Sequence, residues 1–210
     1  MKRVLSVLIL AGSVAAPASA APMSFFAVLN YANEGPPAPP VVSPATGLTV
    51  VTIDPALHTL SVALSFTNLT SGNTAAHIHV INGPGDTNTA DTNGPVTTST
   101  PTFIGLPTGT TFGVFFATYD MTLASSYRSG FITEAGGTTA LAEAALFAGI
   151  MQDRAYLNVH TTLNPGGEIR GFLDACGVPG APACPTVPEP ASLTLAGLAF
   201  AGLVMRRRMR

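Results

Sequence analysis

The chain has 210 residues, of which 47% are hydrophobic and only 10% are charged, and its formal net charge is -2. Between residues 21 and 187 three arginines stand against ten acidic residues and no lysine, so this stretch carries a net charge of -7. Such a composition argues against nucleic-acid binding, which depends on clustered Lys and Arg, and the length excludes a large multidomain enzyme.

The first twenty residues have the three-part plan of a secretory signal peptide. Lys2 and Arg3 precede an apolar run over residues 4–16, and Ala18 and Ala20 supply the small side chains that a signal peptidase needs. Because the run is shorter than the roughly 20 residues of a membrane span, we predict a cleaved signal helix over residues 1–20.

The body, residues 21–175, is predicted to be rich in strands. Short runs of alternating apolar and polar residues are typical of half-buried strands, and Gly, Pro, Asn and Asp mark the turns between them. We expect two short helices, over 121–127 and 138–150, the second because of its Ala and Leu content. Strands are expected over residues 24–31, 47–54, 58–66, 75–82, 95–103, 112–118, 155–162 and 168–175.

This pattern predicts a mainly β fold, an antiparallel Greek-key β-sandwich of immunoglobulin-like or superoxide-dismutase-like type with a short helical insertion. The alternation is strictest from His58 to Phe66, where His58 shares the parity of the apolar residues. We therefore expect His58 to be a core residue at a strand end, with a role as an additional metal ligand as the alternative.

The loop over residues 82–95 is rich in Asn, Asp, Gly and Thr. Asp86 and Asp91 could contribute oxygen ligands to calcium, but their spacing differs from that of an EF-hand. We interpret the loop as a series of turns and keep a calcium site as the alternative.

Three histidines are placed to share one face of the predicted sheet. His77 and His79 are two residues apart, so their side chains leave the same side of a strand, opposite Ile78. His160 has the same relation to its apolar neighbour Val159. If the two strands are neighbours, the three imidazoles could converge on one copper or zinc ion, at about 2.0–2.1 Å from each nitrogen.

A structural hydrogen-bond network is the alternative for these histidines. We expect residues 155–162 and 168–175 to form a hairpin that pairs Thr162 with Glu168, which places His160 opposite Arg170 and Asn158 opposite Phe172. A cation beside His160 would disfavour a bound metal, unless Glu168 neutralises it. In this reading Asn158, Glu168 and Arg170 support the histidines.

A linker over residues 176–187 contains both cysteines of the chain. Cys176 and Cys184 enclose a stretch rich in Gly and Pro. In an exported protein, two cysteines across such a loop predict a disulfide.

The C-terminus, residues 188–210, combines three features in order. Pro188, Glu189 and Pro190 precede fifteen uncharged residues, 191–205, and then a cluster of arginines. Fifteen helical residues reach about 22 Å, which makes a marginal anchor for a bilayer core of about 30 Å, with the arginines on the cytoplasmic side. This end resembles the PEP-CTERM sorting signal of Gram-negative bacteria. The resemblance implies processing by an exosortase and delivery to the cell surface or an extracellular polysaccharide matrix.

The body has its own resemblance, carried by residues 75–80 (AAHIHV), 155–162 (AYLNVHTT) and 164–173 (NPGGEIRGFL). Together these segments resemble the CHRD domain, named after chordin, over about residues 24–174. The resemblance implies an extracellular β-sandwich with structural or binding roles and no established reaction.

Standard catalytic signatures such as the G-x-S-x-G elbow and the H-E-x-x-H helix are missing from the sequence. We therefore expect an exported, non-enzymatic structural or binding protein at the cell surface or in the matrix, with no catalytic residues and no cofactor. Its expected partners are signal peptidase, an exosortase, extracellular polysaccharide or surface proteins, and transiently the inner membrane. The alternatives are a copper- or zinc-binding metalloprotein with His77, His79 and His160, and a calcium-dependent adhesin.

Overall fold

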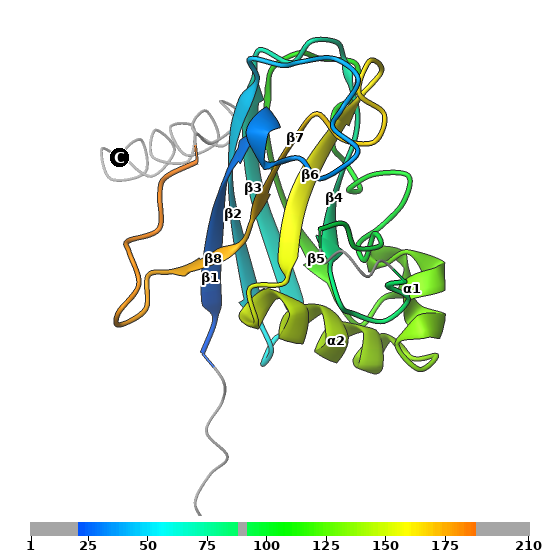
Figure 1. The fold of residues 1–210 in the computed structure, drawn as a ribbon. Helices are drawn as coiled ribbons and strands as arrows, with labels where there is room; N and C mark the ends of the chain where they lie inside the picture. The colour runs from blue at the N-terminus through cyan, green and yellow to red at the C-terminus, as the bar shows by residue number, and fades with distance from the viewer. Residues whose placement is uncertain (1–20, 88–91, 188–210) are drawn as a thin grey trace, which may run out of the picture.

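The computed structural model describes residues 21–87 and 92–187. The predicted signal peptide, Asp91 and the sorting motif at residues 188–190 lie outside these ranges. The described residues form one antiparallel sheet, whose strands lie in the order β4-β6-β7-β1-β2-β3-β5, with β8 paired to β1 (Figure 1). The strands are β1 (Met23–Asn30), β2 (Thr46–Asp54), β3 (Thr59–Thr67), β4 (Asn73–Val80), β5 (Gly113–Asp120), β6 (Ala155–Thr161), β7 (Ile169–Phe172) and β8 (Asp174–Cys176).

The alternating pattern of the sequence explains these strands. In β3, Leu60, Val62 and Leu64 are buried, whereas the residues between them are only partly buried. β3 pairs over nearly its whole length with β2 on one side and β5 on the other. Residues from both halves of the sheet join one hydrophobic core, so the sheet curls around it like a sandwich. The prediction of a mainly β, antiparallel fold is confirmed.

The helices lie between β5 and β6, where the insertion was expected. They are α1 (Ser129–Glu134) and α2 (Thr139–Met151), preceded in the same insertion by the short 3-10 turn η2 (Ala124–Ser126). A second 3-10 turn, η1 (Tyr31–Asn33), follows β1. α2 runs across one end of the sheet, and its buried Leu146 and Ile150 belong to the core (Figure 1). No helix within the described ranges has the length and apolar character required to cross a membrane.

Two element predictions are wrong. Residues 95–103 are not a strand, and they make only isolated bridges, one of which joins His79 to Val96. Threonine hydroxyls replace part of the backbone ladder there, since the Ile78 amide donates to Thr98 Oγ1 and the Ala76 amide to Thr102 Oγ1. Residues 121–127 contain only the turn η2 instead of a helix, and the helix α1 begins at Ser129.

His58 is not a core residue. It lies in the turn before β3 with a φ of 53°, a left-handed conformation that ends the strand's alternation. Its side chain is 54% exposed, and its Nδ1 lies 2.9 Å from Oε2 of Glu143 on α2. His58 is thus engaged with a helix instead of the core.

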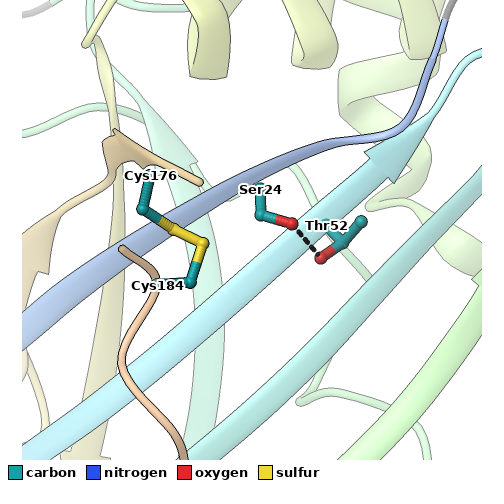
Figure 2. Close-up of a disulfide and its surroundings, with 4 residues drawn as sticks. All are labelled: Ser24, Thr52, Cys176 and Cys184. Carbon is teal, nitrogen blue, oxygen red and sulfur yellow. Dashed lines mark hydrogen bonds between the residues drawn. A yellow bond between two sulfur atoms is a disulfide. The ribbon is translucent and has the colours of Figure 1, made fainter. Parts of the chain in front are cut away.

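The predicted disulfide is present. Cys176, the last residue of β8, is bonded to Cys184, and Figure 2 shows this bond beside β1. Cys176 pairs with Ser24 of β1, whose hydroxyl lies 2.8 Å from that of Thr52 on β2. The cross-link therefore fastens the end of the domain to the sheet.

Candidate functional site

The three histidines of the sequence prediction lie on two neighbouring strands. β4 and β6 are antiparallel, with Ala75 opposite His160, His77 opposite Asn158 and His79 opposite Tyr156. Residues directly opposite one another share a face of the sheet, so the three imidazoles lie on the same side. The apolar residues between them, such as Ile78 and Val159, enter the core on the other side. The expected adjacency of the two strands is confirmed.

The hairpin of β6 and β7 has a different register from the predicted one. Asn158, not His160, lies opposite Arg170, and Tyr156 lies opposite Phe172. The shift of two residues arises in the turn, where Asn164 closes the chain earlier than expected, through its carbonyl to the Thr161 amide at 3.2 Å. Arg170 therefore does not lie directly across from the imidazole of His160.

The imidazoles converge closely. The ring centroid of His77 lies 5.9 Å from that of His79 and 5.2 Å from that of His160, and the remaining pair is 6.0 Å apart. One ring nitrogen from each histidine lies within 4.8 Å of the other two. Nitrogens bound at 2.0–2.1 Å to one ion are at most about 4.2 Å apart. A metal would therefore draw the rings together by a small side-chain movement.

Backbone carbonyls determine which nitrogen of each ring is free. His77 Nε2 lies 2.7 Å from the Pro101 oxygen, and the Nδ1 atoms of His79 and His160 lie 2.9 Å and 3.0 Å from the oxygens of Gly94 and Pro165. Because a carbonyl oxygen only accepts, each of these nitrogens must carry the proton.

The opposite nitrogen of each neutral ring then has an available lone pair. These atoms, Nδ1 of His77 and Nε2 of His79 and His160, are buried and find no hydrogen-bond partner among the described residues. A histidine that donates one N–H to a carbonyl and offers its other nitrogen is the usual form of a metal ligand.

Burial keeps the three rings uncharged. It lowers the pKa of His77 to about 4, with a further contribution from His160, and lowers the pKa of His79 to about 3. The pKa of His160 is also lowered by burial. Near pH 7 the lone pairs are therefore not occupied by protons.

Arg170 is the centre of a second, adjoining arrangement. Its Nε donates to the Asn33 oxygen at 2.6 Å, and its Nη1 donates to the Thr92 oxygen and Asn93 Oδ1, both at 2.7 Å. The Glu34 carboxylate lies 4.0 Å from Nε. Arg170 thereby joins the segment after β1 and the loop after β4 to strand β7.

Tyr156 separates Arg170 from the histidines. The ring of His79 stacks on it with centroids 4.8 Å apart and an interplanar angle of 10°. The Arg170 guanidinium lies over the same phenol ring, 4.7 Å from its centroid. The phenol ring therefore contacts both the histidine cluster and Arg170.

Glu168, which the sequence allowed as a partner that could neutralise Arg170, is engaged with other groups. Its carboxylate accepts hydrogen bonds from Ser43 Oγ at 2.6 Å, from Thr161 Oγ1 at 2.6 Å, and from the amide and hydroxyl of Thr70 at 2.7 and 2.8 Å. Burial acts to raise the pKa of Glu168, but these hydrogen bonds together lower it. Glu34 is the carboxylate beside Arg170. No sequence signal marked it, because it lies in a proline-rich connection between strands.

The loop considered for calcium is described only in part. Asp86 Oδ2 accepts a hydrogen bond from the Asn82 amide at 2.6 Å, which closes a local turn. Asp91 lies outside the described residues.

The fold and the histidine cluster together define an antiparallel β domain that holds three neighbouring, neutral histidines. A family model for the CHRD domain matches residues 25–173, and a model for the PEP-CTERM protein-sorting motif matches residues 186–208. The chain therefore belongs to the CHRD domain family, and its C-terminus carries the sorting motif of an exported, envelope-associated protein that an exosortase processes. No significant match was found among curated proteins or solved structures.

Proposed function

We propose that this protein is a non-enzymatic binding protein of a Gram-negative cell surface or matrix, and that it holds one copper or zinc ion. His77, His79 and His160 would be the ligands. The observation that carries the proposal is that three neighbouring histidines, with ligand nitrogens within 4.8 Å of one another, each have one buried nitrogen without a hydrogen-bond partner among the described residues. Imidazole nitrogen suits both metals, and three such ligands leave a position for water.

The distribution of hydrogen bonds favours an ion over a purely structural network. Arg170 Nε and Nη1 donate to Asn33, Thr92 and Asn93, and the Glu168 carboxylate accepts from Ser43, Thr70 and Thr161, so these hydrogen bonds go to other groups than the three histidines. A buried acceptor without a donor costs about 1–3 kcal/mol, and here three acceptors face one another. One cation would satisfy all three.

The location in the envelope is supported by the sorting motif, and the charge of the domain is compatible with it. A net charge of -7 over residues 21–187, without lysine, suits a protein that stays soluble near anionic polysaccharide without adhering to it nonspecifically.

Metal analysis tests the proposal. The protein, purified without a histidine tag, is expected to contain or take up about one equivalent of copper or zinc, measured by elemental analysis and by titration. His77→Ala and His160→Ala should each weaken binding at least tenfold. His58→Ala is the matched control, because this histidine contacts Glu143 instead of the cluster, and it should bind like the wild type. A folded wild-type protein without stoichiometric metal would refute the proposal.

A further inference from the structure

A cleft of about 290 Å³ lies beside the histidine cluster. Its walls come from the proline-rich segment after β1, from the loop after β4, and from the turn between β6 and β7. His79 and Tyr156 form part of its lining. The volume is at the lower end of the range for ligand pockets, about 300–1,000 Å³, so a ligand here would be small. The lining also includes Glu34, Gly35, Asn93, Asn158 and Gly167.

Two buried oxygen atoms among these residues need hydrogen-bond donors. The Glu34 side chain is 6% exposed and Asn158 is 3% exposed. Glu34 Oε1 and Asn158 Oδ1 have no hydrogen-bond partner among the residues described. Buried polar atoms are nearly always paired, with protein, water or a ligand. Two unpaired acceptors in one cleft therefore point to a ligand that donates.

The charge of the cleft points to a neutral ligand. Glu34 lies 4.0 Å from Arg170, whose Nε donates to Asn33 and whose Nη1 donates to Thr92 and Asn93. Burial raises the pKa of Glu34 to about 7, although Arg170 opposes this. Since the carboxylate and the guanidinium compensate each other, an ionic ligand would bring an unbalanced charge into a buried site.

Two glycines allow the walls of the cleft to pack closely against neighbouring side chains. A Cβ at Gly35 would lie 2.7 Å from Arg170 Nη2 and 2.8 Å from Asn93 Oδ1. A Cβ at Gly167, where φ is +134°, would clash with the amide of Asn158. The rest of the wall includes Pro37, Pro39 and Pro40, whose rings give a rigid apolar surface. A ligand with both hydroxyl groups and C–H surface matches these walls.

We propose that this cleft binds a neutral, hydroxyl-rich molecule of about the size of one sugar unit. Glu34 Oε1 and Asn158 Oδ1 accept hydrogen bonds from two of its hydroxyl groups, and the prolines contact its C–H surface. The inference goes beyond the proposed metal function and does not depend on it, because the acceptors belong to a different set of residues.

NMR titration of the full chain tests this proposal. Isotopically labelled protein at pH 8 is titrated separately with glucose, galactose, mannose and inositol. At least one probe is expected to give saturable shifts, with the largest changes at the amides of Gly94, Gly166 and Gly167. Glucuronate, which carries a negative charge at this pH, should bind at least tenfold more weakly than glucose.

Substitutions at Glu34 and Asn158 test whether these residues accept the hydrogen bonds of the sugar. Glu34→Gln and Asn158→Leu should each weaken binding at least tenfold, whereas Glu134→Gln, a surface control paired with Arg128, should not change it. If a variant does not fold, the shift map of the wild type still decides where the probe binds. Saturation by no neutral probe, shifts confined to other surfaces, or unchanged affinity in folded Glu34→Gln would overturn the proposal. His160→Ala separates the two functions, since it should weaken metal binding at least tenfold and leave sugar binding intact.

Discussion

His77 and His79 are each oriented by a carbonyl from a segment that the sequence separates from them, whereas Pro165, which orients His160, lies in the turn directly after it. Pro101 is 24 residues from His77, and Gly94 is 15 residues from His79. Period-two spacing predicted that the three imidazoles share a face. It did not predict the tautomers, because these depend on which loop lies over the strand. The same limit explains why Glu34 was missed and Glu168 was assigned to the wrong partner.

The hydrogen bonds of the Glu168 carboxylate should contribute to the stability of the domain. Glu168→Gln replaces an acceptor oxygen by an amide donor that faces Ser43, Thr70 and Thr161. We expect a loss of about 3 kcal/mol in the free energy of unfolding, measured by urea denaturation at pH 7. Because the pKa of Glu168 is lowered in the folded state, its stabilisation is present above its ordinary value of 4.5 and disappears as the pH falls below it.

The difference between wild type and Glu168→Gln should therefore shrink in acid. Glu134→Gln, at an exposed ion pair, is the control and should change stability by less than about 1 kcal/mol. A folded Glu168→Gln as stable as the wild type at pH 7 would contradict this account.

At the scale of elements, period-two alternation predicted the position of most strands. It did not predict that the segment lying along β4 is irregular. The segment over residues 95–103 lies along this strand through threonine hydroxyls and a few backbone hydrogen bonds. Thr97, Thr98 and Ser99 are buried in succession, so the segment lacks the one-sided burial of a strand. Residue types that are typical of strands therefore do not distinguish a backbone ladder from an irregular segment held by side-chain hydrogen bonds.

Gly149 shows how closely α2 approaches β4. A Cβ at this position would lie 2.5 Å from Val80 Cγ1 and 2.8 Å from Cγ2. Alanine favours a helix by about 1 kcal/mol over glycine, but overpacking costs about 1–3 kcal/mol. We expect Gly149→Ala to lower the unfolding free energy by about 1–2 kcal/mol in urea denaturation.

A double-mutant cycle with Val80→Ala tests the cause. Gly149→Ala should cost less in the Val80→Ala background, since the clashing methyl groups are gone. Ala144→Gly, on the exposed side of the same helix, should lose about 1 kcal/mol from helix propensity alone. Gly149→Ala more stable than the wild type would show that the helix and strand have room between them.

At the scale of the whole molecule, the domain is closed by its first and last strands. β1 pairs with β2 and with the terminal strand β8, so the N-terminal and C-terminal ends of the domain meet in one sheet. The disulfide lies directly after this junction. The linker toward the sorting motif therefore leaves from a point beside β1.

The disulfide between Cys176 and Cys184 should stabilise the domain. Closing a loop of nine residues is worth about 2.5 kcal/mol in the chain-entropy model. The Cys176→Ser, Cys184→Ser double variant should lose about that amount in the unfolding free energy, and dithiothreitol should not change it further. Dithiothreitol should shift the wild type to the same value. No difference between the oxidised and reduced wild type would show that the loop does not stabilise the domain.

The sequence by itself determined what depends on neighbours along the chain: alternating burial, hence strands; the shared face of the histidines; and the two ends with their motifs. Only the tertiary structure decided the hairpin register, the partners of Glu34, Glu168 and Arg170, and the lone pairs left free in the cluster. The reason is physical. Alternation is a property of one strand, whereas a hydrogen bond between residues such as Asn33 and Arg170, 137 positions apart, exists only after the sheet has closed.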